Sequence, residues 1–412
     1  MSHNPISILH VQYCPGNTII PMGRLAYKNH KIFFEYEASF LQTGLRLSPF
    51  KLPLRPGVIA CEDYVFDGLF GVFNDSLPDG WGRLLVDRKL MQLGIQPASM
   101  TPLDRLRFVG NRGMGALFYE PEIALANREY HDDLDNIHSK CLEIQQFSTD
   151  QHLDDVLHMS GSSCGARPKV LVTFTNSVFE ASENTLKTEH NDWIVKFGAS
   201  SDPADIGSIE YAYHLMAACA HLEVPEARLF ASKHCSGYFG VKRFDRVGKK
   251  FYHMHSASGL LHADHRLPSL DYSTLMKATL WLTKDVFQCE KLFRHAVFNV
   301  LAYNRDDHAK NFSFIMDEHG RWYVSPAYDL TFCVGPLGEH CTTVMREGKN
   351  LTKQHLLQLA QVGGLAQEKA LTILQEVKAA VSQWPKFAQE ANVSKQSSSQ
   401  IQAATKRVSE QF

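Results

Sequence analysis

The octapeptide at residues 304–311, Asn-Arg-Asp-Asp-His-Ala-Lys-Asn, holds the side chains of this chain that are best suited to chemistry. Asp306 and Asn311 have the spacing of the Asp and Asn in the catalytic loop of a phosphoryl-transfer enzyme. There the carboxylate orients a hydroxyl group and accepts its proton, while the amide oxygen holds Mg²⁺. Because these residue types are also common in ordinary loops, the octapeptide alone supports both interpretations equally. Asp307, beside Asp306, is expected to be only a loop carboxylate.

A second carboxylate follows beyond a predicted hairpin. Residues 312–316 and 321–324 are expected to form two short strands around a turn at 317–320, after which the chain reaches Asp329. In kinases, the Asp that follows such a hairpin chelates the Mg²⁺ of the nucleotide. Here the context is Tyr-Asp-Leu instead of Asp-Phe-Gly, and a turn-capping role for Asp329 is the alternative.

Upstream, a run of small residues could bind phosphate. Residues 160–166 are Ser, Gly, Cys and Ala only, and they precede Lys169 and an apolar segment at 170–174 that is expected to be a strand. Small side chains let backbone N–H groups approach phosphate oxygens closely. The run is neither a Walker A loop nor a G-x-G-x-x-G motif, so in isolation a flexible surface linker is the better interpretation.

A lysine and a glutamate are expected to pair beside this loop. Lys196 interrupts the apolar segment 193–197, a predicted strand, and burial of its ammonium group would be costly without a partner. Glu210 opens a predicted amphipathic helix at 209–221. Phosphate oxygens and this glutamate would supply the partners, as in the strand-lysine and helix-glutamate pair of kinases. An outward-pointing lysine on a strand edge is the alternative.

Two further apolar segments, 227–231 and 238–244, are expected to complete the sheet of a small lobe. A kinase hinge, which contacts adenine through backbone groups, would follow them. The linear order is then small-residue loop, lysine strand, glutamate helix, hinge, helical lobe, catalytic loop, hairpin and metal-binding Asp. No single member is decisive, but so many elements in the correct order indicate a kinase-like enzyme.

The sequence also resembles the HipA family, the kinase toxins of bacterial toxin–antitoxin pairs. The resemblance covers about residues 20–380, and its most specific segment is Asp306 to Ser313, Asp-Asp-His-Ala-Lys-Asn-Phe-Ser. The other matching segments are 74–82, 165–169, 193–196, 241–246 and 326–330. The chain departs from many members at Arg167-Pro168, where they have Gln, so the geometry and regulation of its loop are expected to differ.

The resemblance implies an ATP- and Mg²⁺-dependent serine/threonine protein kinase. By position, Asp306 would be the catalytic base, and Asn311 and Asp329 would be the Mg²⁺ ligands. His308 and Lys310 could touch the transferred phosphoryl group, although exposed polar roles are equally open. Lys196 would hold the phosphates, and the backbones of Lys242 and Phe244 would contact adenine. The full set of candidate nucleotide-binding residues is Ser162, Gly165, Ala166, Lys169, Lys196, Glu210, Lys242 and Phe244.

Ser162 falls where the family carries its regulatory autophosphorylation serine, and the neighbouring Ser160 and Ser163 are the alternatives. A phosphate there would add about −1.5 to −2 charge units beside the phosphates of the nucleotide, which is a physical reason for self-inhibition. The resemblance also implies a protein substrate, with translation factors such as aminoacyl-tRNA synthetases as the default class. A helix-turn-helix antitoxin is the implied partner, and DNA would be reached only through it.

Two other classes of function are open. One is a kinase-fold enzyme that phosphorylates a small hydroxyl compound, because the same parts serve antibiotic and sugar kinases. The other is a non-catalytic, kinase-like partner of a DNA-binding antitoxin. The complete set of Lys196, Asp306, Asn311 and Asp329 argues against this second alternative.

Composition is that expected of a cytoplasmic protein. The 412 residues suggest two or three domains, and 44% hydrophobic residues can fill their cores. A formal net charge of −2 offers no basic excess for direct binding to nucleic acid. Nine cysteines without a C-x-x-C pair predict reduced thiols. The sequence has neither a signal peptide nor an apolar run of about 18 residues, so no membrane association is expected.

The expected fold class is α+β, a bilobal protein-kinase-like fold with a small β-rich lobe, a large helical lobe and an extra N-terminal α+β domain. The expected segments are the N-terminal domain at 1–125, a helical connector at 126–157, the small lobe with the phosphate loop at 158–247, the helical lobe at 248–390 and a polar C-terminal tail at 391–412. This tail is expected to be frayed or a loosely docked helix. Residues 77–82 are expected to form a turn into a helix near 82–93, for structure more than chemistry.

Overall fold

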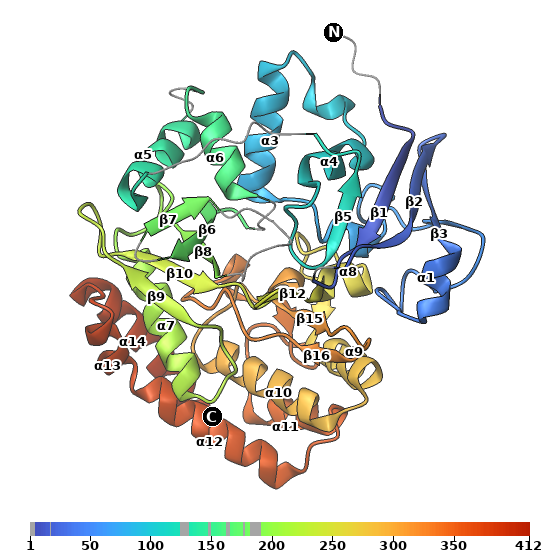
Figure 1. Cartoon of the computed structure of the whole chain (residues 1–412). Coiled ribbons are helices and arrows are strands. Elements are labelled where there is room, and N and C mark those ends of the chain that lie inside the picture. Colours follow the sequence, from blue (N-terminus) through green and yellow to red (C-terminus); the bar gives the residue numbers. More distant parts are fainter. Residues whose placement is uncertain are drawn as a thin grey trace.

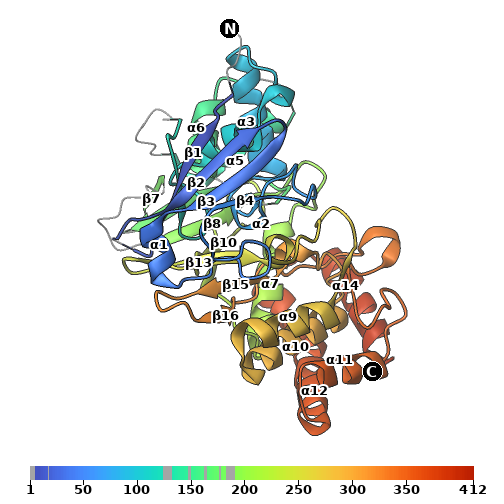
Figure 2. The same cartoon turned by 90° about the vertical axis from the view of Figure 1, so that its right-hand side faces the viewer.

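The computed structural model describes residues 5–16, 18–123, 132–146, 150–161, 165–175, 178–181 and 191–412 (Figure 1). Helices and strands are mixed along the described chain, so the expected α+β class is confirmed. Figures 1 and 2 place the N-terminal sheet at the upper end of the molecule and the C-terminal helices at the lower end. No helix in the described part of the chain combines the length and hydrophobicity that a membrane span requires.

An antiparallel sheet with the strand order β4-β3-β2-β1-β5 forms the N-terminal domain. The strands are β1 (Ile8–Tyr13), β2 (Ile20–Lys28), β3 (Lys31–Tyr36), β4 (Val58–Ala60) and β5 (Leu117–Glu120). In β1, the alternate residues Leu9, Val11 and Tyr13 are buried, because successive side chains of a strand point to opposite faces. The helices of this part are α1 (Ala38–Thr43), α2 (Gly71–Asn74), α3 (Gly80–Gln92), the 3₁₀ turn Pro97–Ser99 and α4 (Pro102–Val109).

A second antiparallel sheet, with the order β7-β6-β8-β10-β9, forms the small lobe. The strands are β6 (Lys169–Thr175), β7 (Val178–Ala181), β8 (Asp192–Lys196), β9 (Ala227–Phe230) and β10 (Tyr238–Lys242), and α7 (Ile206–Cys219) packs against β9 and β10. The two faces of β8 differ: Trp193 and Val195 enter a hydrophobic core, whereas Ile194 and Lys196 line a cavity. The period of two in a strand therefore delivers Lys196 to the cavity.

The segment expected to be a connector is a packed layer of the small lobe. It forms α5 (Leu134–Gln145) and α6 (Leu153–Ser160), which lie beside α3 in Figures 1 and 2. Apolar residues of all three helices share one core with Trp193 and Val195. The polar composition of this segment hides that role, because an amphipathic helix needs only one apolar face to contribute to a core.

The large lobe combines a small sheet with helices. Its strands are β11 (Arg246–Val247), β12 (Lys250–Phe251), β13 (His253–Ser256), β14 (Leu270–Asp271), β15 (Ser313–Met316), β16 (Trp322–Val324) and β17 (Thr342–Thr343). Its helices are α8 (Ala257–Leu261), α9 (Tyr272–Thr283), α10 (Val286–Leu301), α11 (Lys353–Val362), α12 (Gln367–Ser382), α13 (Trp384–Glu390), α14 (Lys395–Ser409) and the 3₁₀ turns Ala309–Asn311 and Pro336–Gly338. β13, β15 and β16 form one antiparallel sheet, which includes the hairpin expected after the catalytic loop.

The last residues of the chain form a docked helix. In α14, Ile401 and Thr405 are buried, and the Trp384 indole N–H donates to the Ser398 carbonyl at 3.0 Å. The Ser394 N–H at its start donates to Asp205 at 2.9 Å. Of the two forms expected for the tail, the structure has the helix, and these contacts attach it to α13 and to the start of α7.

Buried polar contacts hold the N-terminal domain against the rest of the chain. Arg243, Asp245 and Arg246 have fully buried side chains, and Asp245 pairs with both arginines. The Gly115 N–H donates to Asp245 at 2.8 Å, and Arg246 donates to the Gly115 carbonyl at 2.7 Å. These bonds satisfy charges that would be costly to bury unpaired, and they fix the domain beside the hinge.

Candidate active site

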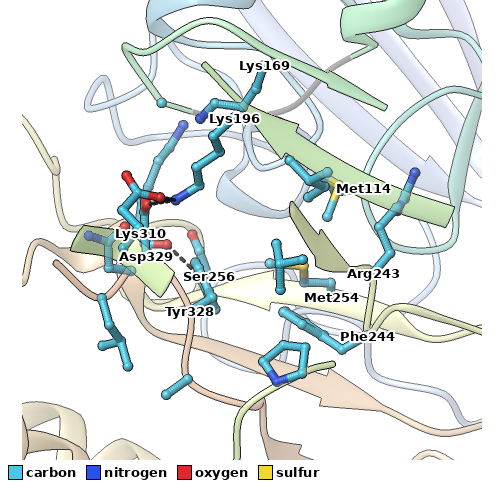
Figure 3. A pocket seen from close by; sticks show the side chains of 18 of the residues that line it. Met114, Lys169, Lys196, Arg243, Phe244, Met254, Ser256, Lys310, Tyr328 and Asp329 are labelled. Atoms are coloured by element: carbon cyan, nitrogen blue, oxygen red, sulfur yellow. Dashed lines mark hydrogen bonds and ion pairs between the residues drawn. The ribbon is translucent and has the colours of Figure 1, made fainter. Parts of the chain in front are cut away.

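A cavity of about 290 Å³ lies between the second sheet, the hinge and the catalytic segments. Figure 3 shows a group of charged side chains at one end of this cavity and apolar side chains at the other, where Arg243 also lies. The charged end includes Lys169, Lys196, Lys310 and Asp329, and the apolar end includes Met114, Phe244 and Met254. Such a division suits a ligand with a flat apolar part and a strongly anionic part.

Lys196 and Glu210 form the ion pair that their positions predicted. The Lys196 Nζ lies 3.0 Å from Glu210 Oε2 and also contacts Asp329 Oδ1. Burial disfavours the charge on Lys196, but the two carboxylates outweigh burial and raise the pKa of its ammonium group. Conversely, Lys196 holds the pKa of Asp329 well below its ordinary value, although burial acts the other way. The alternatives of an edge lysine and a turn-capping Asp do not fit these contacts.

Arg167, the departure from the family pattern, joins the same cluster. Its guanidinium group forms a two-pronged contact with Asp202, at 2.9 and 3.1 Å, and reaches Glu210 Oε1 at 3.1 Å. Glu210 therefore receives Lys196 on one oxygen and Arg167 on the other. Planar guanidinium groups favour this bidentate geometry, which a Gln could not reproduce with the same charge.

The catalytic loop folds back on itself. The Asn311 side chain donates to the Asp306 carbonyl at 2.7 Å, which brings the two predicted residues together. The Asp306 side chain is exposed and does not line the cavity, whereas Asn311 does. Partial shielding from water, with a further contribution from Asp329, raises the pKa of Asp306. Asp306 is therefore held beside the cavity-lining Asn311, with its side chain exposed to solvent.

Asp307 is much more than a loop carboxylate. It is fully buried and accepts hydrogen bonds from the Tyr272 hydroxyl at 2.9 Å, from Thr342 N–H at 3.2 Å and from the His340 ring at 2.9 Å. Three donors from distant parts of the large lobe thus fix the residue next to Asp306. The sequence carried no sign of this role, because two adjacent aspartates look alike until their surroundings are known.

Lys310 and His308 both line the cavity. The Lys310 side chain is 7% exposed, so an exposed polar role for this residue is wrong. The Tyr328 hydroxyl donates to the Lys310 carbonyl at 2.5 Å and holds its backbone in place. His308 is half-buried, and its ring faces that of His265.

The described part of the phosphate loop reaches the cavity through Gly165, Ala166 and Lys169. Gly165 has a φ of 110°, which favours glycine, and a Cβ there would lie 2.3 Å from the Lys169 ammonium. Ser162 and Ser163 lie outside the described residues. Ser160 is fully buried at the end of α6 and accepts a hydrogen bond from the Trp81 indole at 3.1 Å, so it is unsuited to phosphorylation.

The segment expected to be the hinge reaches the cavity. Lys242 and Phe244 line the cavity, and the Phe244 ring packs on Tyr328 at 5.6 Å between centroids. The Lys242 N–H donates to the Glu226 carbonyl at 2.8 Å. That N–H is therefore occupied, and a contact between adenine and the Lys242 backbone would have to use the carbonyl group.

Asp79 is a site residue that sequence reasoning missed. One of its oxygens lies 2.6 Å from the Lys310 Nζ, and the other accepts the Gly165 N–H. The expectation of a turn leading into a helix is correct, since α3 begins at Gly80. The same segment was expected to serve structure more than chemistry, and Asp79 lines the cavity. The available signal was that 74–82 belongs to the segments that resemble the family.

Comparisons with known proteins agree with this geometry. Residues 161–384 match the model of the HipA-like C-terminal domain, and residues 18–120 match that of the HipA N-terminal domain. A Sinorhizobium fredii protein named "Putative kinase Y4dM" is 24% identical over 202 residues, which are 45% of this chain and 49% of that protein. The match therefore spans about half the length of that relative.

A solved structure supports the fold. The complex titled as the toxin–antitoxin system HipA, HipB and operator DNA of Shewanella oneidensis MR-1 contains a chain that aligns with a TM-score of 0.69 and 17% identity. The alignment covers 97% of this chain and 95% of that one, so the expected kinase-like fold with an added N-terminal domain is confirmed. Because two family models together cover both domains, this chain belongs to the HipA family.

Proposed function

We propose that this chain is an ATP- and Mg²⁺-dependent kinase that phosphorylates serine or threonine residues of a cytoplasmic protein. The observation that carries the proposal is the placement of Asp306. Its side chain is exposed, and its carbonyl holds Asn311, which lines the same cavity as Lys196, Glu210 and Asp329. A base in that position can accept a proton from a hydroxyl group that approaches from solvent.

The side chains fit ATP and Mg²⁺. Asp329 and Asn311 offer a carboxylate and an amide oxygen, which are hard ligands that suit Mg²⁺. The metal would neutralise charge on the phosphates during transfer. Lys196 would hold the phosphates, with Gly165 to Lys169 beside them, and the apolar end of the cavity would take adenine. Asp306 would orient the acceptor hydroxyl group and take its proton.

A protein acceptor fits this arrangement better than a small hydroxyl compound. Asp306 faces solvent outside the cavity, so a serine on the surface of a large partner can reach it. Translation factors, including aminoacyl-tRNA synthetases, remain the default substrate class. Ser162 or Ser163 would be the autophosphorylation site, since the burial of Ser160 removes the third candidate.

A DNA-binding antitoxin is the proposed partner. The similar Shewanella protein was solved together with HipB and operator DNA, and this chain aligns with almost all of it. A net charge of −2 offers no basic excess for direct DNA binding, so DNA would be reached through a helix-turn-helix protein.

The test is transfer of labelled phosphate from [γ-³²P]ATP. Purified protein with Mg²⁺ should label a protein of a cytosolic extract, and omission of Mg²⁺ should abolish labelling. Glu318→Gln, which removes a carboxylate from the neighbouring hairpin turn, is the matched control for charge and should keep full activity. Label on small metabolites alone would favour the small-molecule kinase. Failure to bind Mg-ATP in calorimetry would favour the non-catalytic alternative.

A further inference from the structure

Asp79 occupies the N-cap position of α3 but does not cap that helix. An Asp at this position normally accepts a hydrogen bond from a backbone N–H of the first turn of its own helix. Here the N-cap has no side-chain bond to its helix. Its two carboxylate oxygens instead face Gly165 and Lys310. Because Asp79 contacts these two distant residues and not its own helix, a role at the cavity is more consistent with its position than helix capping.

The backbone around Asp79 forms hydrogen bonds with the phosphate loop. The Trp81 N–H donates to the Gly165 carbonyl at 3.0 Å while the Gly165 N–H donates to Asp79, so the two segments pair in both directions. The approach is so close that a Cβ on Gly80 would lie 2.6 Å from the Gly165 carbonyl oxygen. This contact fixes the end of the phosphate loop from the N-terminal domain.

The second partner belongs to the catalytic loop. Lys310 lines the cavity with Lys196, and its ammonium group lies 2.6 Å from Asp79. An ammonium group has three N–H donors, and a bond to Asp79 uses only one of them. Burial would raise the pKa of Asp79, but Lys310, the Gly165 N–H and His265 outweigh it and keep the carboxyl ionised.

We propose that Asp79 is a positioning residue for phosphoryl transfer, which joins the phosphate loop to the catalytic loop and aims Lys310 at the transferred group. The N-terminal domain is then a working part of the active site. This inference rests on the proposed kinase function. Asp79 acts through Lys310 and Gly165, so it need not touch the substrate itself.

Two variants separate the two bonds. Asp79→Asn keeps an oxygen for the Gly165 N–H but removes the charge beside Lys310, whereas Asp79→Ala removes both. For Asp79→Asn we expect kcat to fall roughly 10-fold with KM for ATP nearly unchanged, because misplacing a group costs mainly in the transition state. Asp87→Asn, on the same helix and paired with Arg105 at 2.7 Å, is the matched control and should change kcat less than about 2-fold.

A double-mutant cycle with Lys310→Met tests whether Asp79 acts through Lys310. In the Lys310→Met background, Asp79→Asn should change kcat less than about 2-fold, because residues that act as one unit are not additive. Full additivity, with another 10-fold loss, would overturn the proposal. A merely structural role would lower the melting temperature of Asp79→Asn without this dependence on Lys310.

Hydrogen exchange of the nucleotide-free protein gives a readout that does not need activity. Amides of the segment that follows Gly165 should exchange roughly 10-fold faster in Asp79→Ala than in wild type, because their anchor is gone. An unchanged exchange rate would overturn the proposal that Asp79 holds the phosphate loop. If the wild type transferred no phosphate, the proposed function would fail, while exchange would still decide whether Asp79 holds the loop.

Discussion

The two loops at the phosphate end of the cavity are held in different ways. The catalytic loop is held from within the large lobe, where the buried Asp307 accepts hydrogen bonds from Tyr272, His340 and Thr342. The Asn304 side chain donates to Asn299 at 2.9 Å and adds another anchor from the same lobe. Most of the contacts that hold this loop thus come from its own lobe, and Lys310 adds one to Asp79 of the N-terminal domain.

The phosphate loop is held mainly by other elements. Asp79 and Trp81 reach Gly165 from the N-terminal domain, and Arg167 reaches α7 through Glu210. The catalytic loop therefore depends mainly on contacts within its own lobe, with Asp79 as an outside partner, whereas the described end of the phosphate loop depends largely on the N-terminal domain.

The largest effect is expected for Asp306→Ala, which tests the catalytic loop. If Asp306 is the base, kcat should fall about 10²- to 10⁴-fold in the labelled-phosphate assay. Because the side chain is exposed, the melting temperature should stay within about 1 °C of wild type. Full activity of the variant would show that the base has been assigned wrongly.

Asp307→Ala tests whether the buried Asp307 stabilises the catalytic loop. It removes a buried acceptor and leaves Tyr272, His340 and Thr342 without their partner, so the free energy of unfolding should fall by about 3 kcal/mol. Urea unfolding followed by circular dichroism measures this loss. Glu318→Ala, at an exposed position of the hairpin turn, is the control and should cost about 1 kcal/mol or less. Equal losses for the two variants would contradict the view of Asp307 as the internal anchor.

Trp81→Phe tests whether the N-terminal domain supports the phosphate loop. The change removes the indole bond to Ser160 while keeping an aromatic ring in the core, and the unfolding free energy should fall by about 1 kcal/mol. Because α6 leads directly into the phosphate loop, KM for ATP should rise several-fold with kcat nearly unchanged. A fall in kcat with no change in KM would show that the two halves of the site are not independent.

The smallest effect is a shift in pH dependence. Asp306 must be ionised to accept a proton, and its pKa is raised by shielding from water and by Asp329. Activity should therefore fall as the pH drops through that raised value, on a limb above the ordinary range of an aspartate. A pH profile of kcat/KM measures the limb, and Glu318→Gln should leave it in place. If kcat/KM fell only at the ordinary pKa of an aspartate, Asp306 would not have the shielded surroundings described here.

Much of the site followed from local pattern. The spacing from Asp306 to Asn311, the hairpin before Asp329 and the lysine within an apolar strand depend on neighbours in the chain, and the structure brings these residues together. The packing of the expected connector could not be predicted from local pattern. Its helices look polar in sequence, and only their packing against the second sheet shows that they belong to a core.

The sequence by itself determined the class of fold through its periodicity and predicted the catalytic loop from a short spacing, while its motifs carried the resemblance to the family. Only the tertiary structure showed the surroundings of Asp79 and Asp307. Asp79 lies 231 residues from Lys310, and an Asp before a helix has the same sequence pattern whether it caps that helix or reaches across the molecule. Burial and distant partners gave Asp79 and Asp307 their roles, and neither is visible until the chain has folded.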